Sequence, residues 1–198
     1  MKNIFLFSAL TTALFFSNSL LALTTCSAIP GNLVSNCGFE TGSLSGWTAA
    51  PAGFLNQYYG VDTVDANSGS YGAYLAGQSG NVTLSQTLAT TIGMTYYVTF
   101  DLAHPDPNFA PYTNSFFASF GGQTLYSESV QVFDYTQFTL SGKATSASTV
   151  LQFAAFDPLN FFSLDDVAVY SAPEPSTMAL SVPFLFGGAF WALRRRTL

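Results

Sequence analysis

Short runs of alternating apolar and polar residues fill most of the chain, and Gly, Asn, Asp, Ser and Pro separate them. The runs occupy residues 81–88, 95–103, 115–120, 123–129, 135–142, 148–156 and 161–171. A period of two residues is typical of strands with one buried face, and no long run has the 3.6-residue period of an amphipathic helix. Roughly eight strands within about 145 residues predict one all-β sandwich, in an order compatible with a jelly roll.

The alternation also predicts which side chains face the core. In the run 95–103, one face carries Tyr96, Val98, Phe100 and Leu102. In the last run, strict alternation places alternate residues on opposite faces of the strand. One face would carry Phe162, Leu164, Asp166, Ala168 and Tyr170. The dipeptide Gly121-Gly122 predicts a tight hairpin between the runs 115–120 and 123–129.

The N-terminus has the pattern of an export signal. Lys2 supplies the positive start, and residues 4–16 are apolar with a few Ser and Thr. That apolar stretch is shorter than a membrane span and matches the length of a signal-peptide core. We therefore place a signal peptide at residues 1–25 and the mature domain at 26–171.

The cleavage position decides whether Cys26 stays on the mature protein. Cleavage after Ala22 or Thr24 would also keep it, whereas cleavage after Ala28 would remove it and leave Cys37 as a lone core cysteine. Another alternative is lipidation of Cys26, which the tetrapeptide LTTC suggests. The Thr before the cysteine is bulky and argues against it. Exported proteins meet an oxidising compartment, where an even pair of cysteines suggests a disulfide. We expect a Cys26–Cys37 bridge that pins the first strand.

The C-terminus predicts a membrane anchor. Residues 178–193 carry no charge, and as a helix they would span roughly 24 Å, which is adequate for a thin bilayer. The arginines that follow should stay cytoplasmic, which places the domain outside. The Pro-Glu-Pro tripeptide before the helix is stiff and extended, so a processing enzyme can bind it.

This tail resembles the PEP-CTERM sorting signal of bacteria, which is also catalogued as an ice-binding protein C-terminal domain. The match combines the tripeptide with the apolar span and the basic end: Pro173, Glu174, Pro175, Arg194, Arg195 and Arg196. The resemblance implies that residues 172–198 direct the protein to an exosortase-type protease. It also implies at least transient attachment to the inner membrane, followed by the cell surface or extracellular matrix.

The charge of the chain excludes several partners. Lys143 is the only basic residue between Lys2 and Arg194, and all 11 acidic residues lie in that stretch, so its formal charge is −10. A stretch this acidic repels nucleic acid and anionic lipid. It is compatible with neutral sugars or cations.

Three segments resemble jelly-roll carbohydrate-binding modules, in the order that these modules have. The stretch NLVSNCGFETGSLSGWT at 32–48 is similar to their opening strand and turn, ANSGSYGAYL at 66–75 to their second motif, and SLDDVAVY at 163–170 to their closing strand. Together they span nearly the whole predicted domain. The resemblance implies a single jelly-roll sandwich that associates with extracellular polysaccharide.

The same resemblance implies a structural Ca²⁺ ion held by acids of the first and last strands. Glu40 matches the acid of the opening motif, and Asp165 matches the first Asp of the closing one. Asp65 and Asn67 are further candidate ligands, because calcium accepts six to eight oxygen atoms. The alternative is that Glu40 and Asp165 are solvated turn residues.

Sugar binding requires exposed aromatic rings and amides, because a sugar presents an apolar face with a hydroxyl fringe. Four aromatic residues between the predicted strands are candidates: Phe109, Tyr112, Tyr58 and Tyr59. The alternative for each is packing in the core, which we expect for Trp47.

Catalytic patterns are weak. His104 is the only histidine, and we expect it in a loop, without a nucleophile motif beside it. The adjacent Asp165 and Asp166 would point to opposite faces of a strand and could not flank one glycosidic bond. The sequence therefore predicts a non-catalytic surface or matrix protein, with a purely structural envelope protein and a small extracellular hydrolase as alternatives.

Overall fold

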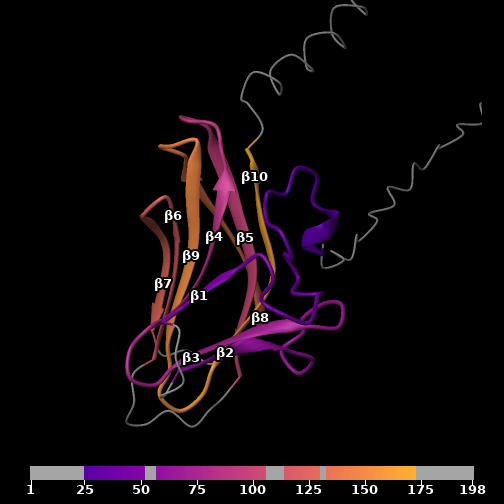
Figure 1. The fold of residues 1–198 in the computed structure, drawn as a ribbon, viewed down its shortest axis with the longest axis vertical. Coiled ribbons are helices and arrows are strands. Elements are labelled where there is room, and N and C mark those ends of the chain that lie inside the picture. Colours follow the sequence, from indigo (N-terminus) through magenta and orange to yellow (C-terminus); the bar gives the residue numbers. More distant parts are fainter. Residues whose placement is uncertain (1–24, 52–56, 106–113, 130–132, 173–198) are drawn as a thin grey trace, which may run out of the picture.

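Ten antiparallel strands build a sandwich of two five-stranded sheets in the computed structural model, which describes residues 25–51, 57–105, 114–129 and 133–172 (Figure 1). A short 3-10 helix, η1 (Cys26–Ala28), precedes them. The strands are β1 (Thr48–Ala50), β2 (Gln57–Asp62), β3 (Gly72–Gly77), β4 (Val82–Ala89), β5 (Thr95–His104), β6 (Ser115–Phe120), β7 (Gln123–Ser129), β8 (Phe133–Lys143), β9 (Ser148–Phe156) and β10 (Phe162–Ser171). The predicted all-β sandwich is confirmed.

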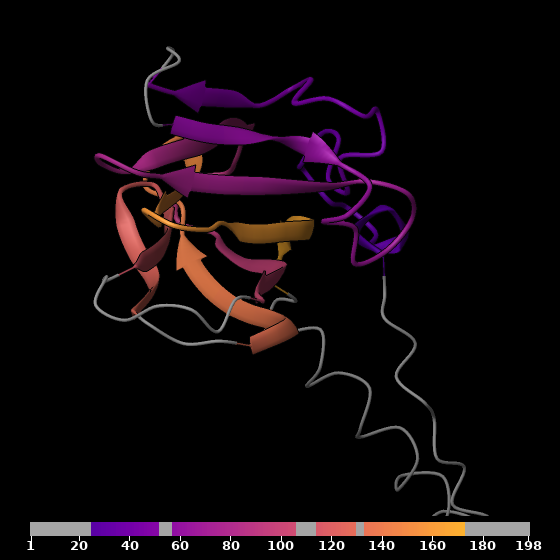
Figure 2. The ribbon, with the colours of Figure 1, turned by 90° about the horizontal axis from the view of Figure 1, so that it is seen from below.

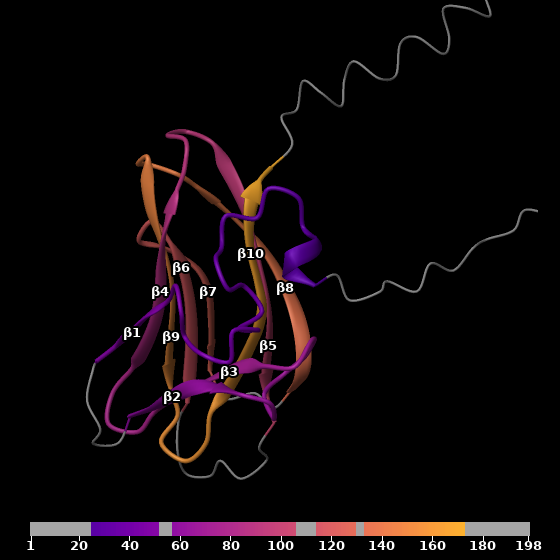
Figure 3. The same cartoon turned by 45° about the vertical axis from the view of Figure 1, so that its right-hand side comes forward.

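Sheet A has the order β1-β4-β9-β6-β7, and sheet B has the order β2-β3-β10-β5-β8. Figure 3 shows the two sheets as separate layers, and Figure 2 shows β2, β3 and β10 side by side. All seven predicted runs form strands, and the Gly121-Gly122 hairpin is present with φ values of 59° and 81°. The remaining strands, β1 to β3, are three to six residues long and lie outside those runs. The opening strand that the resemblance implied within 32–48 is wrong, because turns and loops occupy this stretch up to Thr48.

The core between the sheets is built largely from phenylalanine. Phe153 of sheet A lies with its ring centroid 5.2 Å from Phe100 of sheet B and 5.9 Å from Phe116. All three side chains are fully buried. Trp47 is also buried, and its indole N–H donates to the Asn36 carbonyl over 3.2 Å, which confirms its packing role.

The predicted alternation in the last strand is wrong beyond Asp165. The register between β10 and β5 shifts between Asp165 and Ala168, and Asp166 has a φ of 49°. One extra residue in a strand exchanges its two faces. Four β10 residues therefore enter the core: Phe162, Leu164, Val167 and Val169.

The segment before β1 runs along β10 (Figure 3). The Leu33 N–H donates to the Val169 carbonyl over 2.8 Å, and the Val167 N–H donates to the Cys37 carbonyl over 2.9 Å. A Cys26–Cys37 disulfide closes this segment, with the two Cα atoms 5.9 Å apart. The predicted bridge is therefore confirmed.

The predicted targeting segments lie outside the described residues, apart from Thr25 and Ala172 at their inner ends. This applies to the signal sequence up to residue 24, to the tripeptide at 173–175, to the apolar span 178–193 and to the arginines at 194–196. Among the residues that are described, none forms a helix with the length and apolarity needed to cross a membrane.

Candidate functional site

Glu40, a predicted calcium ligand, holds the loop between β2 and β3. Its carboxylate accepts hydrogen bonds from the backbone N–H groups of Ser70 (2.9 Å) and Tyr71 (3.0 Å). Gly69 has a φ of 63°, and a Cβ atom there would lie 2.3 Å from Glu40 Oε1. The glycine therefore permits the close approach between the carboxylate and the loop.

Asp165, the other principal calcium candidate, holds the same loop from the sheet B side. Its Oδ2 accepts hydrogen bonds from the N–H groups of Asn67 (2.9 Å) and Ser68 (3.0 Å). Its Oδ1 accepts the N–H of Asp166 over 2.7 Å. The loop is thus fixed by two carboxylates that lie 125 positions apart in the sequence.

Three further carboxylates in this region are buried: Asp65, Asp101 and Asp166. Each keeps one oxygen without a hydrogen-bond partner among the described residues. Burial raises the pKa of Asp65 to about 6 and that of Asp165 to about 7, and it also raises the pKa of Asp101. The region therefore concentrates carboxyl groups whose ionised form is costly.

Unpaired carboxylate oxygens suit Ca²⁺ in their chemistry. Within the described part of the chain, however, no group of three or more His, Cys, Asp or Glu side chains is arranged to hold a metal ion. An ion beside Glu40 and Asp165 would therefore need backbone carbonyl and hydroxyl oxygens as well. The structure does not bring Glu40, Asp165 and Asp65 together as such a group, and the Asn67 amide donates to Asp101, so calcium binding stays a prediction.

The predicted sugar-binding aromatics divide between surface and core. Tyr58 lies on the outer face of β2 and is 55% exposed. Tyr59 points the other way, packs against the core and donates its hydroxyl to the Pro51 carbonyl over 3.3 Å. Phe109 and Tyr112 lie outside the described residues.

Tyr58 lines a hollow on the outer side of sheet B, here called the tyrosine pocket. Its volume is about 280 Å³. Three aromatic and three polar side chains line it, with Ala76 and Leu159 between them: Tyr58, Tyr74, Phe161, Asp62, Gln78 and Asn160. Rings and hydrogen-bonding groups therefore line the same surface hollow.

A second hollow, here called the phenylalanine groove, lies on the outer face of sheet A. Its volume is about 400 Å³, and its lining is uncharged: Asn81, Phe117, Ser119, Gly122, Thr124, Gln152 and Ala154. The pairing of Phe117 with Ala154 and of Ser119 with Gln152 brings these side chains together from β6 and β9.

Charge is distributed unevenly between the two sheets. In sheet A, strands β1, β4, β6 and β9 contain no charged residue, and β7 carries Glu128. In sheet B, by contrast, four strands carry charges: Asp62, Asp101, Asp134, Lys143, Asp165 and Asp166. The outer faces of β1, β4, β6 and β9 therefore present only hydroxyl, amide and apolar groups.

Phe117 and Gln152 were not predicted as site residues, although the sequence contained the signal. The alternation that buries Phe116 and Ala118 leaves Phe117 on the outer face. Likewise, buried Leu151 and Phe153 place Gln152 outside. A large aromatic residue on an otherwise polar strand face marks a candidate binding surface.

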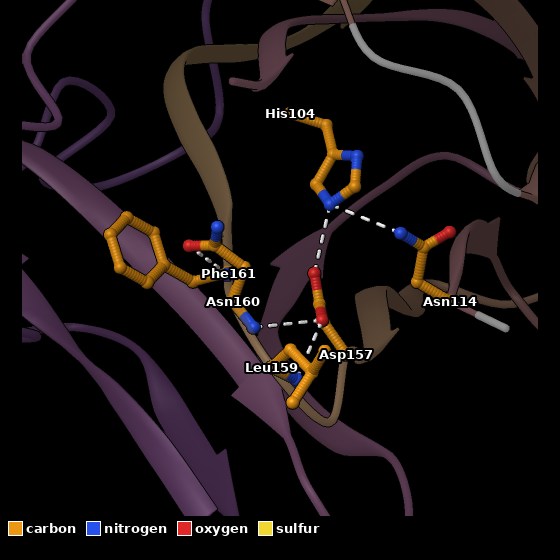
Figure 4. Close-up of polar contacts among 6 residues, drawn as sticks. All are labelled: His104, Asn114, Asp157, Leu159, Asn160 and Phe161. Carbon is orange, nitrogen blue, oxygen red and sulfur yellow. Dashed lines mark hydrogen bonds and ion pairs between the residues drawn. The ribbon is translucent and has the colours of Figure 1, made fainter. Parts of the chain in front are cut away.

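His104 is not in a loop, as the sequence suggested, but ends β5 fully buried. Its Nε2 lies 2.8 Å from Asp157 Oδ2 and 3.2 Å from Asn114 Nδ2 (Figure 4). Its ring stacks on Phe162, with centroids 4.4 Å apart. The hydrogen bond from His104 and two backbone N–H groups outweigh burial and lower the pKa of Asp157. A histidine with no exposed surface is a structural group rather than a proton carrier for a substrate.

Comparison with known proteins identifies the fold. No family model matches the chain, and no curated protein sequence matches it. TmCBM61, solved in complex with β-1,4-galactotriose, superposes with a TM-score of 0.51 and 18% identity over 71% of this chain and 99% of that chain. The CBM22-1 xylan-binding domain of Paenibacillus barcinonensis Xyn10C has a TM-score of 0.52 and 17% identity over 69% and 92%. An adhesin domain of Lys-gingipain from Porphyromonas gingivalis has a TM-score of 0.52 and 16% identity over 69% and 96%. The described domain thus has the jelly-roll sandwich fold of carbohydrate-binding modules.

Proposed function

We propose that this chain is a non-catalytic, exported protein whose phenylalanine groove binds an uncharged polysaccharide. The observation that carries this proposal is the outer face of sheet A, where the half-buried Phe117 of β6 lies beside uncharged polar side chains of β6, β7 and β9. The carbohydrate-binding modules that share its fold support the same class of ligand.

The groove has the chemistry that a sugar chain needs. The C–H face of a pyranose ring packs on an aromatic ring, and its hydroxyls bond to amides and hydroxyls. Phe117 supplies the ring, Gln152 and Asn81 supply amides, and Ser119 and Thr124 supply hydroxyls. The lining offers no cation to an acidic polysaccharide, and the chain has a formal charge of −6, which would repel such a ligand.

The same lining supports a binding role without hydrolysis. Glycoside hydrolysis normally uses two carboxyl groups on either side of the scissile bond. The groove lining contains no carboxylate among the described residues. The groove would therefore retain a polysaccharide chain without cleaving it.

Export and sorting complete the proposal. The signal sequence would direct the chain out of the cytoplasm, and the tail at 172–198 would present it to an exosortase-type protease in the membrane. A calcium ion bound by Glu40 and Asp165 would join the first and last parts of the domain, since these residues already hold one loop. The product would sit at the cell surface or in the matrix, where polysaccharide is its partner.

Calorimetric titration of the exported protein with a panel of neutral polysaccharides tests the groove. We expect saturable binding that Phe117→Ala weakens about tenfold, which corresponds to about 1.4 kcal/mol. Thr139→Ala, an exposed position on the outer side of sheet B, is the control and should bind like the wild type. Absence of saturable binding to the whole panel would instead favour a purely structural envelope protein.

A further inference from the structure

We propose that the tyrosine pocket is a second sugar-binding site, which takes the terminal residue of a neutral polysaccharide, so that one domain joins two chains. The ligand class rests on the proposed function, whereas the site itself rests on separate residues in sheet B. The two sites can therefore fail independently.

The pocket offers rings at an angle rather than a single flat surface. Tyr74 and Phe161 lie with centroids 5.9 Å apart and planes at 57°, and Tyr58 is more than half exposed beside them. Gly60 makes room for the Tyr74 ring, because a Cβ atom at Gly60 would lie 2.5 Å from the Tyr74 hydroxyl oxygen. Such walls can contact two faces of one sugar ring.

The polar side chains of the pocket suit hydroxyl groups. Asp62 Oδ1 accepts the N–H groups of Val64 (2.8 Å) and Asp65 (3.0 Å), which fixes the direction of its carboxylate. A fixed carboxylate accepts hydrogen bonds from sugar hydroxyls, and it repels an acidic sugar. The amide of Gln78 adds a donor and an acceptor, whereas Asn160 Oδ1 already accepts the Phe161 N–H over 3.1 Å. The pocket is therefore selective for neutral sugars.

Size distinguishes the pocket from the groove. A volume of about 280 Å³ lies just below the usual range of ligand sites and fits roughly one or two sugar rings. The groove, at about 400 Å³, lies on an open sheet face and spans β6 and β9. We therefore assign a chain end to the pocket and a chain interior to the groove.

The far wall of the pocket is held rigidly by buried groups. Asp157 Oδ1 accepts the N–H groups of Leu159 (3.1 Å) and Asn160 (2.9 Å), while its Oδ2 lies 2.8 Å from the buried His104 ring (Figure 4). The loop that presents Asn160 and Phe161 is thus anchored to the core. A wall that is already ordered loses little entropy when a ligand binds.

The two sites face opposite directions. Tyr58 and Tyr74 point outward from sheet B, since Tyr59 and Leu75 point to the core. Phe117 points outward from sheet A, and the whole core lies between them. Two ligands bound on opposite faces belong to different chains or to distant parts of one chain. The domain would therefore cross-link polysaccharide.

The test is calorimetry of the exported protein with neutral oligosaccharides of three to six residues, including β-1,4-galactotriose, followed by light scattering with the parent polymer. We expect two sites per wild-type molecule, and one site in either Tyr58→Ala or Phe117→Ala. Polymer scattering should rise with the wild type and stay low with both variants, because each keeps a single site. Gly60→Ala, which displaces the Tyr74 ring without removing it, should weaken the pocket site at least tenfold.

Tyr170→Ala is the matched control, since Tyr170 is a half-buried tyrosine on the same outer face and lines neither hollow. It should keep two sites and full scattering. If the wild type has one binding site per molecule and Tyr58→Ala keeps it, the tyrosine pocket is not a sugar site. The proposal for the phenylalanine groove would then be unaffected. One site that Tyr58→Ala removes and Phe117→Ala does not would overturn the groove and the cross-linking. No saturable binding to any oligosaccharide would overturn both sites.

Discussion

Removing the Cys26–Cys37 bridge should lower the unfolding free energy of the domain, and the length of the closed loop sets the size of the loss. The bridge closes a loop with a sequence separation of 11, for which loop entropy gives about 3 kcal/mol. Hydrogen bonds from Leu33 to Val169 and from Val167 to Cys37 hold the same segment on β10, so the segment should remain docked without the bridge. For a domain of this size, about 3 kcal/mol corresponds to a fall in melting temperature of about 6–12 °C.

The assay is scanning calorimetry of the double variant Cys26→Ser/Cys37→Ser beside the wild type, without reductant. Wild type with reductant is the control, and its melting temperature should equal that of the double variant. A melting-temperature difference of less than about 2 °C would contradict this prediction, because it would mean that the bridge restricts the unfolded chain very little. Mass spectrometry that finds Cys26 missing from the mature protein would refute it as well, since no bridge could then form.

Three other perturbations probe the core, the loop and the buried acids. Phe153→Ala removes a ring at the centre of the aromatic core and should cost about 3–5 kcal/mol in urea unfolding; a loss under about 1 kcal/mol would contradict the packing described here. Gly69→Ala should cost about 1–2 kcal/mol from its positive φ alone, with more from contact with Glu40, and a neutral effect would mean that the loop is held differently. In EDTA, unfolding free energy should fall as the pH rises from about 4 through about 6 and about 7, because burial raises the pKa of Asp65 and Asp165 in the folded state, whereas the lowered pKa of Asp157 acts only at lower pH. Stability that stays flat or rises across this range in a denaturant titration would contradict those shifts.

The sequence predicted the strands well, because a sandwich strand shows its buried face in the local pattern. Phe116, Ala118 and Phe120 alternate with outward residues in the sequence and are all fully buried. The short strands escaped prediction for a physical reason. β3 contains two glycines and is buried on both faces, so it has no alternation to detect.

Features that depend on distant partners were not visible in the sequence. His104 precedes a proline in the sequence, which suggested a loop, but Asp157 at the end of β9 and Phe162 in β10 bury it. The bulge at Asp166 likewise depends on tertiary contacts, since the Val167 N–H pairs with Cys37 and Asp166 Oδ1 accepts the Cys26 N–H over 2.8 Å. Local alternation carries no information about either.

The candidate site residues could be predicted from the sequence only in part. Tyr58 was singled out as an aromatic residue between strands, and it lies at the tyrosine pocket. Phe117 was not predicted as a site residue, because it lies at an outward position within a strand and not between strands. The register that joins Phe117, Ser119 and Gln152 on one face is a property of the sheet, not of any single run.

Native affinity electrophoresis of the protein in gels containing neutral polysaccharides is the decisive test of sugar binding by sheet A. We expect at least one such polysaccharide to retard the wild type and the Thr139→Ala control, and Phe117→Ala to migrate faster in the same gel. Equal migration of wild type and Phe117→Ala in every polysaccharide gel would contradict the claim that sheet A binds sugar.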